Sequence, residues 1–267
     1  MSEFFIKDPA ERKSRAIEKE KSVLKFLRDE IYSITPILAV EMGVQDRAAR
    51  TLLNRMEKKK LIIRDEIRFM GSRAVILWGI TTAGILEYLT PEEVSTVSLR
   101  YHSPGRVSPL TIEHTLDIQR CRQYCENSMN CKDWIPTRYL PAQNKKRHHS
   151  KRWSVYPDGL ISYPSNEKGF FPICLEIERN RKTPKRYVQI IKGHLKNISH
   201  NRYHHAWYFC TNQKAADSLK ALFLRLLVEN QCSLFFSDDE IYSKEECMEF
   251  FSFSGIPFSR ANSLVIP

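Results

Sequence analysis

Long hydrophobic runs are absent from this sequence. No stretch approaches the roughly 18 consecutive apolar residues that a helix needs to cross a bilayer. The first residues, from Met1 onward, also lack the apolar core and the cleavage site of a secretory signal peptide. We therefore expect no membrane insertion and a cytoplasmic location.

The sequence also lacks the paired cysteines of a structural metal site. Its seven cysteines are odd in number, and no two of them form a Cys-x-x-Cys motif. In a reducing compartment such cysteines are expected to be thiols of the core rather than a disulfide framework. Cys121, Cys125 and Cys131 lie near one another, but the further cysteine or histidine pair that accompanies such zinc sites is missing.

Acidic residues are in short supply. The chain has 31 Asp and Glu against 42 Lys and Arg, which gives a formal net charge of +11. Such an excess attracts polyanions at long range, and nucleic acid is the usual partner. A hydrophobic fraction of 42% is enough for packed cores and excludes wholesale disorder. The length of 267 residues, without an internal repeat or a low-complexity tract, predicts two domains.

The first 90 residues carry a series of helix and strand signals. Residues 1–15 are charged and without apolar periodicity, which predicts a flexible arm. Helical spacing of apolar residues begins near residue 17, Thr35-Pro36 starts a second helix, and Gly43 ends it. The pattern then predicts, in order, a helix over 45–59, strands over 61–64 and 75–80, and a short helix capped by Thr81-Thr82.

Three helices followed by a β-ribbon are typical of a winged helix-turn-helix domain, which we assign to residues 16–90. In such a domain the third helix enters the major groove of DNA and the ribbon lies near phosphates. The side chains expected to contact DNA are Arg47, Arg50, Thr51 and Asn54 on the helix, and Arg68 and Arg73 in the ribbon. The alternative is a winged helix that contacts protein, and the basic charge balance favours DNA.

A stretch punctuated by prolines, over 91–111, predicts the linker to a second domain. That domain is assigned to 112–240, beginning with a helix over about 112–127, and residues 241–267 are expected to form a C-terminal tail. A segment over 138–152 contains many basic residues and no acidic residue, among them Lys145, Lys146 and Arg147. It is either a solvated loop or a loop that follows DNA phosphates.

Acidic residues of the second domain gather in one predicted β-hairpin. A strand reaching Ile161 is followed by a turn and by an apolar strand that contains Glu176 and Glu178. Side chains two residues apart on a strand point the same way, and Asp158 on the neighbouring strand brings a third carboxylate to that face. Buried carboxylates are costly unless a cation pairs with them. Three converging acids suit Mg²⁺ or Mn²⁺, which prefer oxygen ligands.

Basic residues follow this hairpin and leave two interpretations open. In one, the two glutamates form an ordinary salt-bridge network with Arg179, Arg181, Lys182 or Arg186. In the other, a cation beside a metal centre holds the scissile phosphate. The candidates for that role, on or just before a helix predicted over 184–198, are Lys182, Lys185 and Arg186. His114, early in the helix before the hairpin, is a further candidate for the site.

These motifs resemble the signature of PD-(D/E)XK nucleases, in which an aspartate and a following acid hold the metal. The matching residues are Pro157-Asp158 and Glu176-x-Glu178. In that superfamily the last residue is usually Lys, so Glu178 departs from the pattern, and Lys182 or Lys185 is expected to replace the lysine. The resemblance implies a restriction-endonuclease-like core with a mixed central sheet. Together with the N-terminal winged helix-turn-helix, this predicts an α/β (α+β) fold for the chain.

A narrower resemblance is to plasmid mobilisation relaxases of the MobC type. It rests on Pro157-Asp158-Gly159, on residues 175–179 and on Arg186-Tyr187, and it covers roughly residues 15–225. It implies metal-dependent nicking of one strand of double-stranded DNA at an origin of transfer, within a relaxosome that contains an accessory protein and a coupling protein. The open alternatives are a DNA-binding regulator or replication protein with an inactive nuclease core, and a restriction or repair endonuclease.

Overall fold

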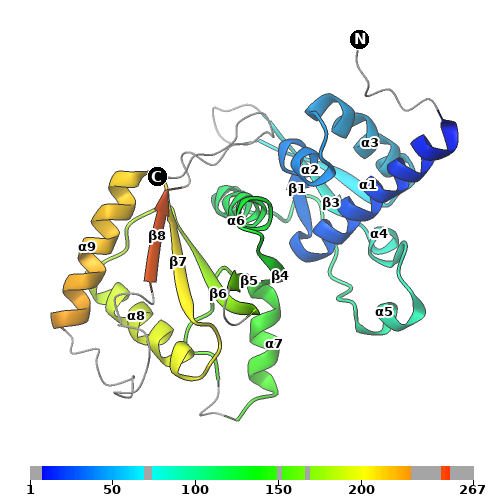
Figure 1. The fold of residues 1–267 in the computed structure, drawn as a ribbon. Coiled ribbons are helices and arrows are strands. Elements are labelled where there is room, and N and C mark those ends of the chain that lie inside the picture. The colour runs from blue at the N-terminus through cyan, green and yellow to red at the C-terminus, as the bar shows by residue number, and fades with distance from the viewer. Residues whose placement is uncertain (1–7, 69–73, 149–151, 166–168, 230–247, 253–267) are drawn as a thin grey trace. The chain divides into compact units, whose positions relative to one another are not determined.

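The computed structural model describes residues 8–68, 74–148, 152–165, 169–229 and 248–252 (Figure 1). The chain divides into a first unit that ends at Gln119 and a second unit that begins at Arg120. The first unit has a three-stranded sheet and the second a five-stranded one, so the predicted α/β class with a mixed central sheet is confirmed. Within the described ranges, no helix is long and apolar enough to cross a membrane.

The first unit combines helices with a small antiparallel sheet. Its elements are, in chain order, α1 (Pro9–Glu30), β1 (Tyr32–Ile34), α2 (Thr35–Met42), α3 (Asp46–Lys58), β2 (Ile62–Ile67), β3 (Val75–Ile80), α4 (Thr82–Leu86) and α5 (Pro91–Thr96). The strand order is β1-β3-β2, and the central β3 pairs antiparallel with both neighbours. Leu24, Leu38, Leu53 and Trp78 are buried in the core that joins these helices to the sheet.

Capping residues that the sequence analysis identified determine where several of these elements begin and end. Gly43 ends α2 in the left-handed region, at φ 63°, and its N–H bonds to the carbonyls of Ala39 and Val40. Thr81 caps α4 by accepting a hydrogen bond from the N–H of Gly84 at 3.0 Å. The helix predicted over 45–59 and the strands predicted from 61 and 75 are confirmed as α3, β2 and β3, whereas β1 was not predicted.

The start of α1 corrects the predicted arm. The side chain of Asp8 accepts a hydrogen bond from the N–H of Ala10 at 2.9 Å, and Pro9 lies in the first turn, where its missing N–H is no loss. Glu11 and Arg15 add an exposed ion pair at 3.0 Å. Residues 9–15 are therefore helical, because a capping signal rather than apolar periodicity sets the start of this helix.

The predicted linker over 91–111 is also corrected. Thr90 and Glu93 form a capping box that starts α5 within it. His102 is buried, and its ring Nε2 lies 2.9 Å from Oδ2 of Asp65 on β2. The segment therefore packs on the first unit, because a buried hydrogen bond holds it there. The boundary between the units falls further along, inside α6 (Pro109–Ser128).

The second unit is built on a mixed sheet with helices on both faces. The elements after α6 are β4 (Lys132–Pro136), η1 (Thr137–Tyr139), α7 (Leu140–Lys145), β5 (Gly159–Ser165), β6 (Gly169–Glu178), α8 (Pro184–Ser199), β7 (His205–Cys210), α9 (Gln213–Glu229) and β8 (Met248–Ser252). The strand order is β4-β5-β6-β7-β8, antiparallel as far as β6 and parallel from β6 to β8.

The two faces of this sheet are covered by different helices (Figure 1). Cys174 and Tyr208 point to α8 and α9 and share a buried core with Tyr187 and Phe223 of those helices. Because side chains alternate along a strand, Phe209 points the opposite way. There its ring meets that of Tyr124 on α6, with the centroids 6.4 Å apart.

The C-terminal edge strand corrects the predicted tail over 241–267. β8 lies within that segment and pairs parallel with β7, with Met248 opposite Ala206. Five residues are too few to show a clear period-2 pattern, and pairing with the open edge of β7 makes the segment a strand. The apolar residues within 233–236 also predict an edge strand, and they lie outside the described residues.

Candidate functional site

The β5–β6 hairpin positions the predicted acids. β5 begins at Gly159, so Asp158 lies one residue before the strand on which it was predicted. Asp158 still bonds to β6, since its N–H donates to the carbonyl of Leu175 at 3.0 Å and its Oδ2 accepts from the N–H of Ile177 at 2.8 Å. These two hydrogen bonds hold Asp158 beside Glu176, which lies between Leu175 and Ile177 in the strand.

Glu176 and Glu178 both point to the sheet face that α8 covers, as strand alternation predicts. Glu176 Oε1 lies 3.5 Å from Nε2 of His194 on α8. Glu178 forms an ion pair with Lys182, just before that helix. The side chain of Glu176 is 18% exposed and that of Glu178 is 8% exposed. The pair therefore lies at the edge of the buried core, and Glu176 is the more accessible member.

Burial and like charges act together on one carboxyl group. Burial raises the pKa of Glu176 well above its usual range, and the carboxylate of Asp158 raises it further. Lys182 opposes this shift, and Glu178 adds to it. Among the described residues, Oε1 of Glu176 and Oε1 of Glu178 are buried without a hydrogen-bond partner. This arrangement is costly by itself, and a bound cation would offset the cost.

Next to Glu176 lies a buried polar network that the sequence did not predict. His194 is fully buried, with Nε2 2.8 Å from the hydroxyl of Tyr208 and Nδ1 2.7 Å from that of Tyr203. Burial lowers the pKa of His194 to about 3, so the ring is neutral and carries one N–H. One hydroxyl therefore donates to the ring and the other accepts from it. One sequence feature could have indicated this network: His194 follows the core residue Tyr187 by two helical turns, which places both on the buried side of α8.

Of the three basic candidates, the structure brings Lys182 to the acids. Its backbone N–H donates to the hydroxyl of Tyr187 at 3.0 Å, and its ammonium reaches the carboxylate of Glu178. Lys185 and Arg186 are exposed on the first turn of α8, and in the described structure no ion pair joins them to the acids. The salt-bridge interpretation therefore holds for Glu178, whereas the neighbouring Glu176 keeps a buried oxygen without a hydrogen bond.

A pocket of about 300 Å³ lies beside Glu178, at the C-terminal ends of β6 and β7. Arg179, Arg181 and Lys214 line it, and Glu178 is the acid in its wall. The guanidinium of Arg181 donates to the hydroxyl of Ser218 on α9 at 2.7 Å, which fixes its direction. The pocket thus offers positive charge to an anionic group next to the acids.

The basic segment predicted as a loop over 138–152 is partly helical, because 140–145 form α7. Lys145 ends this helix and is exposed, as is Lys146. The guanidinium of Arg147 donates to the side chain of Gln143, one helical turn earlier, at 3.2 Å. Residues 149–151 of the segment lie outside the described residues. The three predicted cations therefore lie at, or directly after, the C-terminal end of α7.

The predicted DNA-contacting residues of α3 share its exposed side. Ala49, Leu53 and Met56 are buried against the core. The residues that face solvent include Arg47, Arg50, Thr51 and Asn54. Arg68 is exposed after β2 and pairs with Glu66 at 3.1 Å, and Arg73 lies outside the described residues. The helix thus presents four of the predicted contacts together.

The remaining candidates are His114 and the cysteines. His114 is half-buried on α6 and belongs to the first unit, whereas the acids belong to the second. The described cysteines are buried thiols that form no disulfide, as predicted for core residues: Cys121, Cys125, Cys131, Cys174 and Cys210. Cys232 and Cys247 lie outside the described residues.

Comparison of the chain with protein-family models, with curated proteins and with solved structures found no match. Among the residues that the structure describes, no three histidine, cysteine, aspartate or glutamate side chains form a set that could hold a metal ion. Glu178 is already paired with Lys182. Asp158 and Glu176 are therefore the two carboxylates to consider as ligands.

Proposed function

We propose that the chain binds double-stranded DNA through its first unit and cleaves a phosphodiester bond with Mg²⁺ or Mn²⁺ at Asp158 and Glu176 of its second unit. The observation that carries this proposal is the state of Glu176. Its Oε1 is buried without a hydrogen bond, and burial and Asp158 raise its pKa. A carboxyl group held in this way only reduces stability unless it binds something cationic.

The first unit is proposed to be a winged helix-turn-helix domain. Three helices followed by the β2–β3 ribbon support this, and β1 completes the small sheet on the other side of β3. In this proposal α3 enters the major groove with Arg47, Arg50, Thr51 and Asn54. The exposure of these four side chains and the formal net charge of +11 favour DNA over a protein partner.

The double variant Arg47→Ala, Arg50→Ala is expected to bind duplex DNA at least about tenfold more weakly than the wild type, because each arginine contacts a base edge or a phosphate. Both side chains are exposed, so the fold should persist. Fluorescence anisotropy with a labelled duplex measures the effect. Lys196→Ala, Lys220→Ala removes the same charge from exposed positions of the second unit and is the control. An equal loss in both variants would contradict a specific role for α3.

The donor atoms of the second unit suit Mg²⁺ or Mn²⁺. These hard cations are often held by one or two carboxylates, with waters and a substrate phosphate completing the shell, and Asp158 and Glu176 supply two. When bound, such a metal polarises a phosphodiester and provides a hydroxide. Glu178 is proposed to position Lys182, whose ammonium takes the place of the lysine missing at position 178 and holds a phosphate oxygen.

The cations around the acids are proposed to guide the DNA backbone. Arg179, Arg181 and Lys214 line the pocket beside Glu178, and phosphate groups are the anions that DNA would bring there. Lys185 and Arg186, exposed on α8, would act on the DNA at a greater distance from the acids than Lys182. We assign Lys145, Lys146 and Arg147 to the same backbone-contacting role.

The resemblance to MobC-type relaxases extends the proposal to nicking of one strand at an origin of transfer, with a relaxosome accessory protein and a coupling protein as partners. The test incubates the full chain with supercoiled plasmid that carries its own mobilisation region, in Mn²⁺ or in EDTA. We expect open circles in Mn²⁺ alone, with the break at one position. Linear product would indicate a restriction or repair endonuclease.

A second candidate function is a DNA-binding regulator or replication protein with an inactive core. The ion pair of Glu178 with Lys182 favours it, because it removes one acid from the predicted set of three ligands. In the same plasmid assay this candidate predicts tight DNA binding without cleavage in Mg²⁺ or Mn²⁺. That outcome would refute the nuclease proposal and retain the DNA-binding one.

A further inference from the structure

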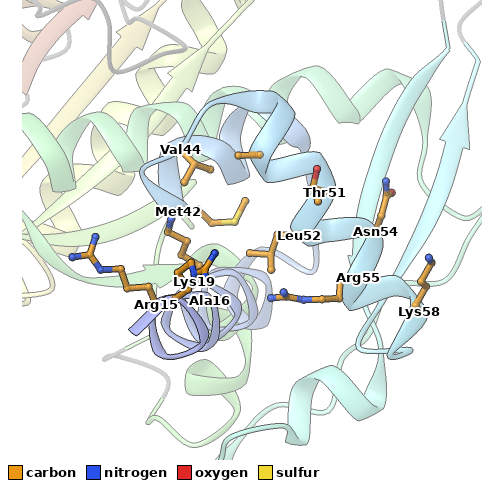
Figure 2. A pocket seen from close by; sticks show the side chains of 12 residues that line it. Arg15, Ala16, Lys19, Met42, Val44, Thr51, Leu52, Asn54, Arg55 and Lys58 are labelled. Carbon is orange, nitrogen blue, oxygen red and sulfur yellow. The ribbon is translucent and has the colours of Figure 1, made fainter. Parts of the chain in front are cut away.

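A basic groove runs between α1 and α3 in the first unit (Figure 2). It has a volume of about 790 Å³, and its cationic lining comes from both helices. Arg12, Arg15 and Lys19 lie on α1, and Arg55 and Lys58 lie on α3. Among the described residues, no acidic side chain lines it. The predicted DNA contacts Thr51 and Asn54 also border the groove, which makes it continuous with the exposed side of α3.

The spacing on α1 places its three cations on one side of the helix. Position 12 comes three and four residues before positions 15 and 16, which come four and three residues before position 19, so all four lie on one side of the helix. Ala16 also lines the groove beside these cations, and its small side chain takes up little of the groove's volume. From Arg12 to Lys19 the helix rises about 10 Å, which is the axial rise of about three nucleotides of one DNA strand.

A buried acid near the groove, Glu20, already has cationic partners. Glu20 of α1 is 1% exposed and pairs with Arg55 at 2.7 Å and with Lys59 at 2.8 Å. Burial by itself would raise the pKa of Glu20, but Lys59 and Arg55 outweigh burial and hold it below its usual range. Glu20 is therefore ionised near neutral pH and cancels charge on α3. Glu20 does not cancel the cations that α1 contributes to the groove. Arg15 does pair with Glu11 at 3.0 Å, but that pair is exposed, and exposed ion pairs are weak enough for a phosphate to compete with them.

We infer that this groove holds the DNA phosphate backbone, so that Arg12, Arg15 and Lys19 of α1 form a second contact line beside the one on α3. This inference rests on the proposed DNA binding and adds residues that the sequence pattern placed in a flexible arm or left unassigned. An acidic protein segment would be attracted by the same charge. The continuity of the groove with Thr51 and Asn54 favours the duplex that α3 is proposed to bind.

The test compares the salt dependence of duplex binding for the full chain and for Arg12→Gln, Arg15→Gln, Lys19→Gln. The affinity falls as salt rises, and each lost phosphate contact reduces the steepness of log affinity against log salt by about 0.9. Losing three contacts therefore reduces the steepness by about 2.7. Affinity should fall about 100-fold near 0.15 M salt and converge with the wild type toward 1 M. Glutamine keeps a good helix propensity, so α1 should remain folded, which circular dichroism checks.

The matched control is Lys13→Gln, Lys21→Gln, Lys25→Gln, which removes three exposed cations of α1 that do not line the groove. We expect the slope of log affinity against log salt for this control to differ from that of the wild type by no more than about 0.9, the value of one phosphate contact. Equal slopes for the two triple variants would overturn the inference and leave the α3 proposal intact. A wild type without salt-dependent duplex binding would refute the proposed DNA binding itself. Polyglutamate that binds the wild type but not the groove variant, with duplex binding equal in both, would assign the groove to an acidic segment instead.

Discussion

Asp158→Asn and Glu176→Gln are each expected to slow metal-dependent DNA cleavage by about 10²–10³-fold, with the affinity for duplex DNA unchanged. Both amides keep the size of the side chain and lose the negative charge that a divalent cation requires. An amide oxygen at position 158 can still accept the hydrogen bond from the N–H of Ile177, so the hairpin should persist. The measurement is the single-turnover rate at which supercoiled plasmid becomes open circles in Mn²⁺.

Asp217→Asn is the matched control for this experiment. Asp217 is exposed on α9 and accepts a hydrogen bond from the side chain of Gln213 at 2.8 Å. Its substitution removes the same charge from the same unit, at a residue that does not line the pocket beside Glu178, and should leave the rate unchanged. If an active wild type loses nothing on substitution of Asp158 or Glu176, cleavage takes place elsewhere and the assignment of the acids is wrong.

Most of the first unit could be predicted because its signals are local. Pro36 and Gly43 mark the two ends of α2, and the apolar spacing of Ala49, Leu53 and Met56 defines the buried side of α3. These features act within one or two turns of the chain, so composition and spacing are enough to reveal them. The same reasoning predicted the exposed side of α3.

The edge strands could not be predicted, because partners distant in sequence create them. β1 has three residues and becomes a strand by pairing with β3, where Ser33 lies opposite Trp78. β4 and β8 form the two edges of the larger sheet in the same way. The segment after Thr90 was predicted to be a linker for a related reason. What holds it is the buried contact of His102 with Asp65, which no periodicity within the segment reveals.

The acids were predictable from strand alternation, but their partners were not. Alternation alone is enough to place Glu176 and Glu178 on one face of the sheet. The loop before α8 then distinguishes them, since Lys182 pairs with Glu178 and leaves Glu176 beside the neutral His194. Two similar glutamates thereby acquire different roles, one proposed as a metal ligand and the other as the residue that positions a cation.

Glu176→Gln is also expected to stabilise the metal-free protein above acidic pH. Burial, and then Asp158, raises the pKa of Glu176 in the folded state, whereas a glutamate in the unfolded chain has a pKa of about 4.3. Between these two values the native state binds more protons than the unfolded state. The free energy of unfolding of the wild type therefore falls as pH rises through this window, by up to about 1.4 kcal/mol per pH unit. The amide does not titrate and avoids this loss.

Urea unfolding from about pH 4 to about pH 9 measures the difference. Three of the four tryptophans, Trp134, Trp153 and Trp207, lie in the second unit and report on it by fluorescence. The two proteins should be nearly equal at the acid end and separate as pH rises, with the variant more stable. Glu229→Gln, at an exposed acid of α9, should follow the wild type.

A Glu176→Gln variant that is less stable than the wild type at every pH would mean that native contacts favour the ionised acid, which is the opposite of the expected sign. Mn²⁺ provides an independent comparison at the alkaline end. It should stabilise the wild type and leave the variant unchanged, because a ligand that binds the folded state and not the unfolded state stabilises the folded state. The burial that makes the bare carboxylate of Glu176 costly is the same burial that a bound cation would offset, so stability and cleavage should respond to the metal through one residue.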